Sequence, residues 1–318
     1  MNEDHWDPEM LASHQAYTDM AARHPPMVLQ SPLDGARATN DALALALAGT
    51  GPAMHTEDRW VAARGRRVLC RLYRPGPGPL PVLIYFHGGG WVWSSIDTHD
   101  RLAREYATAT GCAVVSVDYA LSPEARFPQA LEECAAVVRH IAANGPAWHI
   151  DPARIAVGGD SAGGNLATVV SIAARESGDL PIAFQLLIYP ATDQHRSAPS
   201  HAENGQGYLL TSETMAYFTG HYIADPAQYA DWRASPLLHE NLANLPPALV
   251  VTAGFDPLRD EGKAYAERLT AAGNAASYVC FDRQIHGFIT MGKLLDEANT
   301  AVALCATELK RALSTRPR

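Results

Sequence analysis

The chain has 318 residues, of which 47% are hydrophobic and 19% are charged, and its formal net charge is -9. This length suits one large α/β domain with an elaboration, and the composition is that of a soluble globular protein. The negative charge and the lack of a Lys/Arg cluster exclude a nucleic-acid footprint, which needs a basic stripe. The longest apolar runs, such as residues 42–48, fall far short of the ~20 residues that span a bilayer.

The amino end and the cysteines both bear on the cellular compartment. Residues 1–6 are acidic and polar, whereas a secretory signal peptide needs a basic start and an apolar core. The five cysteines lack C-x-x-C spacing, and four lie in apolar surroundings. They are typical of reduced core residues and indicate neither a disulfide framework nor a metal site. We therefore expect a cytoplasmic protein.

The first fifty residues predict helices without an intervening strand. Asp7-Pro8 and Ser31-Pro32 are each typical of a helix start, because a capping side chain precedes a proline. An alanine- and leucine-rich segment follows the second start. We expect residues 1–50 to form the amino-terminal part of a helical cap.

Beyond residue 50, short apolar strands alternate with helices. The expected strands cover residues 68–73, 82–86, 113–118, 154–157, 184–189, 248–253 and 276–281. The expected helices cover residues 103–110, 127–143, 165–174 and 294–313. Such alternation predicts an α/β fold with a largely parallel sheet covered on both faces. The first two strands read as an edge hairpin, because a Pro/Gly-rich turn joins them.

The segment 191–237 interrupts this alternation. It is rich in His, Ser, Gly and Tyr, and it contains one expected helix that begins at Ser212. A connection of this length between two strands is more often a functional insertion than a plain link. We expect it to form the second part of the cap, inserted into a catalytic domain that covers residues 51–318.

A G-x-S-x-G pattern lies at residues 159–163, between an expected strand and an expected helix. In turns this pattern also occurs by chance, but the strand-turn-helix context is that of a nucleophile elbow. Small residues are needed two positions before and after the serine, and Gly159 and Gly163 meet that need. Ser161 is therefore the candidate nucleophile, at the carboxyl edge of the sheet.

Candidates for a base and an acid follow later strands. His286 and Asp256 each lie just past the end of an expected strand, and the order Ser, Asp, His is that of the α/β-hydrolase fold. An imidazole must take the serine proton, and a carboxylate must orient the imidazole. Asp260 and Asp282 are alternatives for the acid, although Asp260 is expected on the next helix and Asp282 is close to His286 in the chain. An exposed loop position is the alternative for His286.

The HGGGW stretch at residues 87–91 follows a strand that is expected to be buried. Consecutive glycines leave backbone N–H groups free to turn toward a developing negative charge. We expect Gly88 and Gly89, with the N–H of Ala162, to form an oxyanion hole. A flexible turn or a phosphate loop is the alternative, but neither Walker spacing nor G-x-G-x-x-G is present. His87 is expected to be structural.

Five ordered motifs carry a resemblance to a known family. They are HGGGW at 87–91, DYALSPE at 118–124, GDSAGG at 159–164, DPLRDEG at 256–262 and HGF at 286–288. Together they resemble the hormone-sensitive-lipase-like carboxylesterases, bacterial family IV, in its GDSAG group, over roughly residues 60–318. The chain departs from the family at Ala120 and Ser122, where Arg and Ala are usual, in a mainly structural stretch.

The resemblance implies an α/β-hydrolase fold, with a mostly parallel central sheet flanked by helices and a two-part helical cap over Ser161. It implies a serine carboxylesterase that uses Ser161, His286 and Asp256 and forms an acyl-enzyme intermediate. It also implies no metal or organic cofactor, a small-molecule ester as the substrate, and a homodimer through the last edge strand.

Aromatic residues near the expected cap are candidates for the substrate pocket. Trp91, Tyr208, Phe218 and Tyr222 would narrow such a pocket and favour short- to medium-chain acyl esters, about C2 to C8, over long triglycerides. Placement in the core is the alternative for each of them.

Two other functions compete with ester hydrolysis. A non-catalytic small-molecule receptor on the same fold is one, as in plant hormone receptors of related sequence, but such proteins usually lose a member of the triad and His286 is present. An amidase or peptidase is the other. It would need a dedicated acid for an amine leaving group or a separate propeller domain, for which the length leaves no room.

Overall fold

In the computed structural model, residues 33–314 are described. The strands are β1 (His55–Ala63), β2 (Arg66–Arg74), β3 (Leu80–Phe86), β4 (Ala113–Asp118), β5 (Ile150–Asp160), β6 (Ile182–Ile188), β7 (Ala248–Phe255) and β8 (Ala276–Ile285). The helices are α2 (Leu33–Ala48), α3 (Asp100–Thr110), α4 (Gln129–Asn144), α5 (Ala162–Ser177), α6 (Pro199–Asn204), α7 (Ser212–Tyr222), α8 (Arg259–Ala271) and α9 (Asp296–Ser314). The helix expected to start at Asp7 lies outside the described residues.

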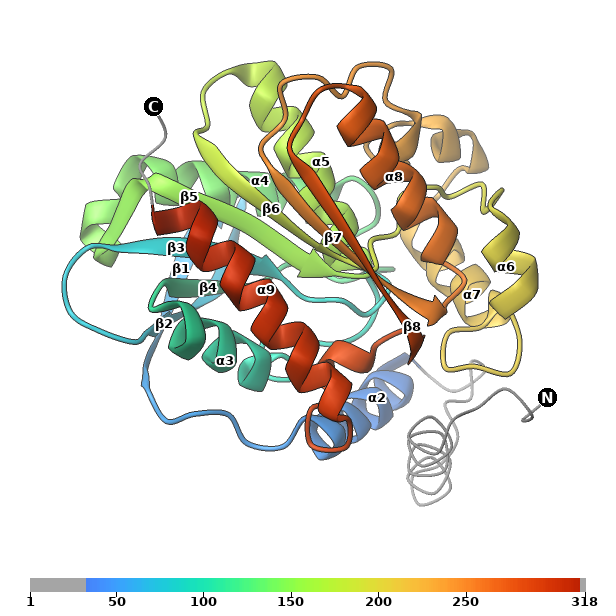
Figure 1. Ribbon diagram of the computed structural model, residues 1–318, viewed down its shortest axis with the longest axis horizontal. Helices are drawn as coiled ribbons and strands as arrows, with labels where there is room; N and C mark the ends of the chain where they lie inside the picture. The colour runs from blue at the N-terminus through green and yellow to red at the C-terminus, as the bar shows by residue number, and fades with distance from the viewer. Residues whose placement is uncertain (1–32, 315–318) are drawn as a thin grey trace.

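The described strands form one eight-stranded sheet in the order β1-β2-β4-β3-β5-β6-β7-β8 (Figure 1). β1 and β4 are both antiparallel to β2, and the remaining neighbours are parallel. Every expected strand and helix in this part of the chain is present within a few residues of its expected bounds. The prediction of a largely parallel sheet in an α/β fold is confirmed.

The expected edge hairpin is wrong. β2 does not pair with β3 but lies between β1 and β4, while β3 lies between β4 and β5. The physical reason is that β3 is apolar on both faces, and such a strand is stable only inside a sheet that is covered on both sides. β1, which was not among the expected strands, is the true hairpin partner of β2.

The core lies in two layers, one on each face of the sheet. Val82, Ile84 and Phe86 of β3 pack with residues of α4, α5 and α8. Leu83 and Tyr85 point the other way and pack with residues of α2, α3 and α9. Alternation of side chains along a strand explains this division. The α3 and α9 helices lie side by side on one face of the sheet (Figure 1).

The connection between β6 and β7 carries two helices that lie beside the carboxyl ends of the strands (Figure 1). α7 begins at Ser212, as expected, and the Oγ1 of its N-cap residue Thr211 accepts a hydrogen bond from Thr214 N at 3.1 Å. The short α6 was not expected. It is attached to the body of the protein, since Ser200 N donates to Asp260 Oδ2 at 3.0 Å.

The α2 helix is attached to two loops of the main domain through one arginine. Arg37 Nε donates to Val92 O, and Arg37 Nη2 donates to Ser122 O, both at 2.8 Å. Arg37 also pairs with Glu124 at 2.8 Å. Ser122, where the family usually has alanine, donates its own hydroxyl to Ala125 O at 2.8 Å. The departure from the family pattern is therefore accommodated by a local hydrogen bond.

The cysteines agree with the expectation of reduced core residues. Cys70, Cys112, Cys134 and Cys305 are buried, Cys280 is half-buried, and all of them are free thiols. Burial raises the pKa of the Cys70 thiol to about 12, so this group stays protonated near neutral pH.

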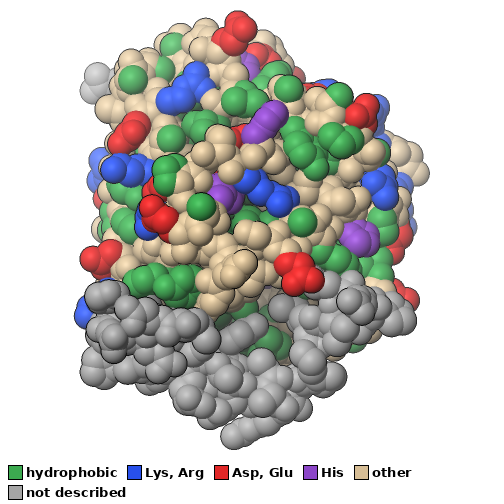
Figure 2. Space-filling view, turned by 90° about the vertical axis from the view of Figure 1, so that its right-hand side faces the viewer, with side chains coloured by type: hydrophobic (Ala, Val, Ile, Leu, Met, Phe, Trp, Pro, Cys, Tyr) green, Lys and Arg blue, Asp and Glu red, His purple; other side chains and the backbone are tan. Residues whose placement is uncertain are grey.

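The face that looks onto the carboxyl ends of the strands and the β6–β7 connection carries acidic and basic side chains interspersed (Figure 2). On the described part of this face no patch of a single sign stands out. Of the helices within residues 33–314, none is long and apolar enough to cross a bilayer.

Candidate active site

The turn between β5 and α5 places Ser161 in an unusual backbone conformation. Its φ is 56° and its ψ is -118°, a region that non-glycine residues rarely adopt. Ser161 N donates to Ile188 O of β6 at 2.9 Å, which stabilises the turn. A Cβ atom on Gly159 or on Gly163 would overlap the carbonyl oxygen of Phe86. The two glycines therefore allow the elbow to pack directly against the end of β3.

Ser161, His286 and Asp256 form a continuous chain of hydrogen bonds. His286 Nε2 lies 2.9 Å from Ser161 Oγ, and His286 Nδ1 lies 2.8 Å from Asp256 Oδ2. Asp256 is fully buried, and its Oδ1 accepts from Leu258 N at 2.8 Å. Because a carboxylate can only accept, Nδ1 carries the imidazole proton and Nε2 is free to accept from the serine hydroxyl.

The two alternative acids do not contact the ring nitrogens of His286, which are bound to Asp256 and Ser161. Asp260 pairs with Arg259 at 2.7 Å and accepts from Ser200 N. Asp282 is exposed on β8. Within residues 33–314 no group of three or more His, Cys, Asp or Glu side chains is arranged to hold a metal ion.

The glycine loop after β3 differs in one respect from the expected oxyanion hole. Gly88 N donates to Asp160 Oδ1 at 3.0 Å, so this N–H already has a hydrogen-bond acceptor. The N–H groups of Gly89 and Gly90 donate to no described residue, and both glycines line the same cavity as Ser161. Ala162 is the first residue of α5, where no helical carbonyl precedes its N–H. Gly90 therefore replaces Gly88 as a candidate oxyanion donor. The buried Asp160 carboxylate accepts from the first glycine amide, and the HGGGW motif by itself does not reveal this contact.

A cavity of about 180 Å³ opens onto Ser161 and His286. Of the four expected pocket residues, Trp91 and Phe218 line it. Tyr222 and Tyr208 do not, which corrects the expectation. Tyr222 is fully buried and stacks on the outer face of Trp91 with ring centroids 4.3 Å apart. Tyr208 packs against Phe255 with centroids 5.1 Å apart.

Comparison with known proteins identifies the family. A model of the alpha/beta hydrolase fold matches residues 83–290. The chain belongs to this family. Esterase LipI of Mycobacterium tuberculosis is 41% identical over 243 residues, 74% of each chain. The carboxylesterase NlhH of the same organism is 38% identical over 269 residues, which cover 82% of this chain and 84% of that protein. The solved ester-hydrolase EH1AB1 from the metagenome of Lake Arreo matches with a TM-score of 0.93 and 38% identity, covering 98% of this chain and 100% of that chain.

These relatives confirm the resemblance to the hormone-sensitive-lipase-like carboxylesterases, and the chain is a carboxylic ester hydrolase of the alpha/beta hydrolase family. These two relatives are an esterase and a carboxylesterase, and each is at least 38% identical to this chain over most of its length.

In this hydrolase, Asp160, the residue before Ser161, connects the elbow to the glycine loop. Asp160 is buried, and it accepts from Tyr85 Oη at 2.9 Å as well as from Gly88 N. His99 Nε2 lies 3.2 Å from Asp160 Oδ1. Burial would raise the pKa of Asp160, but the His99 imidazole and these hydrogen bonds outweigh it, so the pKa lies below its usual 3.8. The carboxylate is therefore ionised at neutral pH.

His87, the first residue of the loop, is structural as expected. It is fully buried, its Nδ1 donates to Gly88 O at 2.7 Å, and its ring stacks on Tyr119 at 4.4 Å. Burial, with the neighbouring His99, lowers its pKa to about 3, so the ring stays neutral. A neutral buried imidazole supports the loop and does not contact the cavity.

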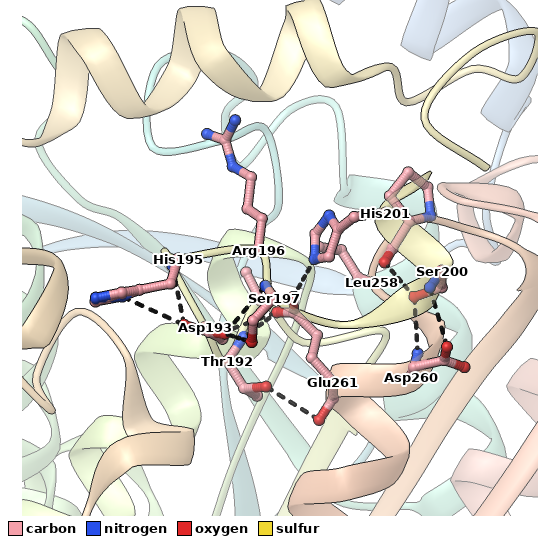
Figure 3. Close-up of polar contacts among 12 residues, drawn as sticks. Thr192, Asp193, His195, Arg196, Ser197, Ser200, His201, Leu258, Asp260 and Glu261 are labelled. Carbon is pink, nitrogen blue, oxygen red and sulfur yellow. Dashed lines mark hydrogen bonds and ion pairs between the residues drawn. The ribbon is translucent and has the colours of Figure 1, made fainter. Parts of the chain in front are cut away.

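Several cavity residues were missed by the sequence reasoning, and a buried pair is central among them. Glu261 Oε2 lies 2.6 Å from His201 Nε2, and Glu261 Oε1 accepts from Thr192 N at 2.5 Å and Asp193 N at 3.1 Å (Figure 3). Burial raises the pKa of Glu261, against the opposing effect of His201 and the amides. These contacts join α8 to the β6–β7 connection. The signal was present in the DPLRDEG motif, whose glutamate had no assigned role.

We expect Asp160→Asn to lower stability by about 1–3 kcal/mol at pH 7, because hydrogen bonds to a buried charge are lost. The pKa of Asp160 is lower in the folded protein than in the unfolded chain, where it is near 4. The ionised carboxylate therefore stabilises the fold fully at pH values above the unfolded pKa, and this stabilisation is lost as the pH falls through the folded pKa. The difference in Tm from wild type should therefore be constant from pH 7 to about pH 5 and shrink below about pH 4.

Thermal unfolding followed by circular dichroism from pH 7 to pH 3 measures this difference. Asp282→Asn, which changes an exposed carboxyl group, is the matched control and should unfold like wild type throughout. A Tm difference for Asp160→Asn that grows toward acid pH would contradict the assignment.

Proposed function

We propose that this protein is a serine carboxylesterase for short- to medium-chain acyl esters, acting through Ser161, His286 and Asp256 and an acyl-enzyme intermediate. The observation that carries the proposal is the uninterrupted chain of hydrogen bonds from Ser161 Oγ, through both nitrogens of His286, to the buried Asp256. No cofactor is required for this chemistry.

In the acylation step, Ser161 Oγ attacks the ester carbonyl carbon while its proton passes to His286 Nε2. The Asp256 carboxylate, 2.8 Å from Nδ1, stabilises the imidazolium that forms. His286 then gives the proton to the leaving alkoxide, and the carbonyl is restored as the acyl enzyme. In deacylation, His286 takes a proton from water, the hydroxide attacks the acyl carbon, and Ser161 leaves with the returned proton.

The proposed oxyanion hole consists of the N–H groups of Gly89, Gly90 and Ala162. Support comes from the two glycine amides, which have no partner among the described residues and face the same cavity. Ala162 adds an N–H at the start of α5, where the helix dipole also favours negative charge. Such preorganised donors stabilise the tetrahedral intermediate more than the substrate.

The proposed cap has two parts, residues 1–50 and residues 191–237. From the first part, Leu43 and Leu47 of α2 line the cavity. From the second part, Met215 and Phe218 of α7 line it. Both parts thus contribute apolar walls to the space above Ser161, while residues 51–318 form the catalytic domain around the sheet.

The preference for short to medium acyl chains is supported by the size of the cavity. Its volume of about 180 Å³ is close to that of an engineered 150 Å³ protein cavity that binds benzene. Phe218 and Trp93 meet edge to face with centroids 4.6 Å apart and narrow the space. A long acyl chain would have to displace these rings.

We expect Ser161→Ala and His286→Ala to lower kcat/KM for 4-nitrophenyl butyrate by at least about 10,000-fold, because the nucleophile or its base is lost. Ser171→Ala is the matched control, since Ser171 lies on the same helix and bonds only Ala167 O. Stopped assays and labelling with a fluorophosphonate report activity and the modified residue. Equal rates for Ser161→Ala and wild type would sink the proposal, whereas a wild type that hydrolyses no ester would favour a receptor.

With a series of 4-nitrophenyl esters, we expect kcat/KM to peak between about C2 and C8, because the cavity is small. Phe218→Ala removes a wall and should shift the optimum to longer chains. Tyr222→Phe should not, because the Tyr222 ring lies behind Trp91, outside the cavity. An optimum at C12 or longer for wild type would contradict the proposed substrate class.

We also propose a cytoplasmic homodimer that associates through β8. Free thiols at every cysteine suit a reducing compartment. β8 is the last strand of the sheet and pairs only with β7 among the described strands, so its outer edge has unpaired backbone groups.

Sedimentation velocity should give twice the monomer mass of 34.2 kDa, and Cys280→Pro on β8 should reduce it to a monomer. A monomeric wild type at micromolar concentration would refute the dimer.

A further inference from the structure

One charged residue of the catalytic cavity has no oppositely charged partner. The ionisable side chains that line the cavity are paired among themselves or with close neighbours, in the pairs His99–Asp160, His201–Glu261, His286–Asp256 and His195–Asp193. Arg196 also lines the cavity, and no described carboxylate lies within 4.0 Å of its guanidinium. Among the ionisable side chains described around the cavity, Arg196 is therefore the exception that contacts no acidic or basic partner.

The contacts of Arg196 use only part of its hydrogen-bonding capacity. Its Nη2 donates to Met215 O at 2.7 Å and to Thr219 Oγ1, both on α7. Nε and Nη1 donate to no described residue, and neither is among the fully buried polar atoms. A guanidinium has five N–H groups, so three of them remain available beside the cavity.

The backbone around Arg196 is shaped to present this side chain. Arg196 has a φ of 55°, which is unfavourable for a residue with a Cβ. The Asp193 carboxylate stabilises the turn, because it accepts from His195 N at 2.9 Å and from Ser197 Oγ at 2.7 Å. The Arg196 side chain extends away from Asp193 and Glu261 toward the neighbouring helix (Figure 3). Strain of this kind is typical of functional positions.

The nearby carboxylates do not serve as partners for Arg196. Asp193 is bound by the turn, and both oxygens of Glu261 are bound by His201 and by backbone amides. The third polar neighbour is Gln194. Its Nε2 donates to Ala234 O, and its Oε1 accepts from Thr219 Oγ1. The three free N–H groups of Arg196 therefore lack an internal acceptor.

We propose that Arg196 is a specificity-determining residue that binds a carboxylate carried by the substrate, at the end remote from the scissile ester. The preferred substrates are then esters with a free acid group, such as half-esters of dicarboxylic acids. This inference rests on the proposed function and adds the substrate class of the same site.

A carboxylate suits this position better than a neutral group. Burial lowers the pKa of Arg196, and the more distant Tyr229 and Glu261 offset this effect only in part, so the guanidinium has lost hydration that these groups do not fully replace. Charge-assisted hydrogen bonds between guanidinium and carboxylate are about twice as strong as those between neutral groups. Met215 and Phe218 of α7 form apolar walls of the cavity. These walls limit the water that competes with the contact between guanidinium and carboxylate.

The test compares matched pairs of esters. On the acyl side, mono-4-nitrophenyl adipate is compared with 4-nitrophenyl hexanoate. On the alcohol side, 4-acetoxybenzoate is compared with 4-acetoxytoluene. In at least one pair, the ratio of kcat/KM for the acid to that for the neutral ester should fall about 10-fold in Arg196→Met relative to wild type, mainly through KM. Arg196→Lys should retain part of the preference.

Arg126→Met is the matched control. Arg126 also donates to a backbone carbonyl of α7, Gly220 O at 3.3 Å, but it is exposed and does not line the cavity. Its variant should keep the wild-type ratio in both pairs. A ratio that is unchanged in Arg196→Met for both pairs, or that falls equally in Arg126→Met, overturns the inference.

A second measurement does not depend on the folding of the variants. Adipate should inhibit 4-nitrophenyl butyrate hydrolysis by wild type competitively and more strongly than hexanoic acid amide does, and added salt should weaken this inhibition. Equal inhibition overturns the inference. The proposed function fails separately, namely if Ser161→Ala still hydrolyses 4-nitrophenyl butyrate at the wild-type rate.

Discussion

The active site depends on the close packing of the β5–α5 turn against the end of β3. Gly159 and Gly163 bring the turn to the carbonyl of Phe86, where any side chain would collide. This contact positions Ser161 next to the glycine loop that follows β3. Ser161 and the glycine loop follow different strands, β5 and β3, so the packing of these strands sets the distance between them.

Asp160 adds a polar connection to this apolar contact. Its ionised carboxylate accepts from Gly88 N and Tyr85 Oη, and thereby links the elbow to the first turn of the glycine loop. The first amide of the loop is used for this purpose, and the amides of Gly89 and Gly90 have no partner among the described residues. A buried charge is costly unless donors surround it, and here the donors are groups that the catalytic site needs in place.

The β6–β7 connection is joined to the catalytic machinery at its base. Asn204 Nδ2 donates to the backbone oxygen of Asp256 at 3.3 Å, and Ser200 Oγ donates to Pro257 O at 2.6 Å. Glu261 binds the start of the same connection through backbone amides. The loop that carries Asp256 thus also supports the connection whose residues line the cavity. The β6–β7 connection and Asp256 are therefore attached to each other directly by hydrogen bonds.

Local chemistry made much of this protein predictable from its sequence. The elbow around Ser161 needs glycines at set spacings, and the positions of Asp256 and His286 after apolar strands follow from the parallel sheet, because the carboxyl ends of parallel strands share one edge. Each of these features is encoded in a short stretch of consecutive residues. The tertiary structure decided what depends on distant neighbours: the partner of β2, the use of Gly88 N by Asp160, and the burial of Tyr222 behind Trp91. It also brought Arg196 to the cavity without an anion, since charge compensation depends on every group that packs nearby.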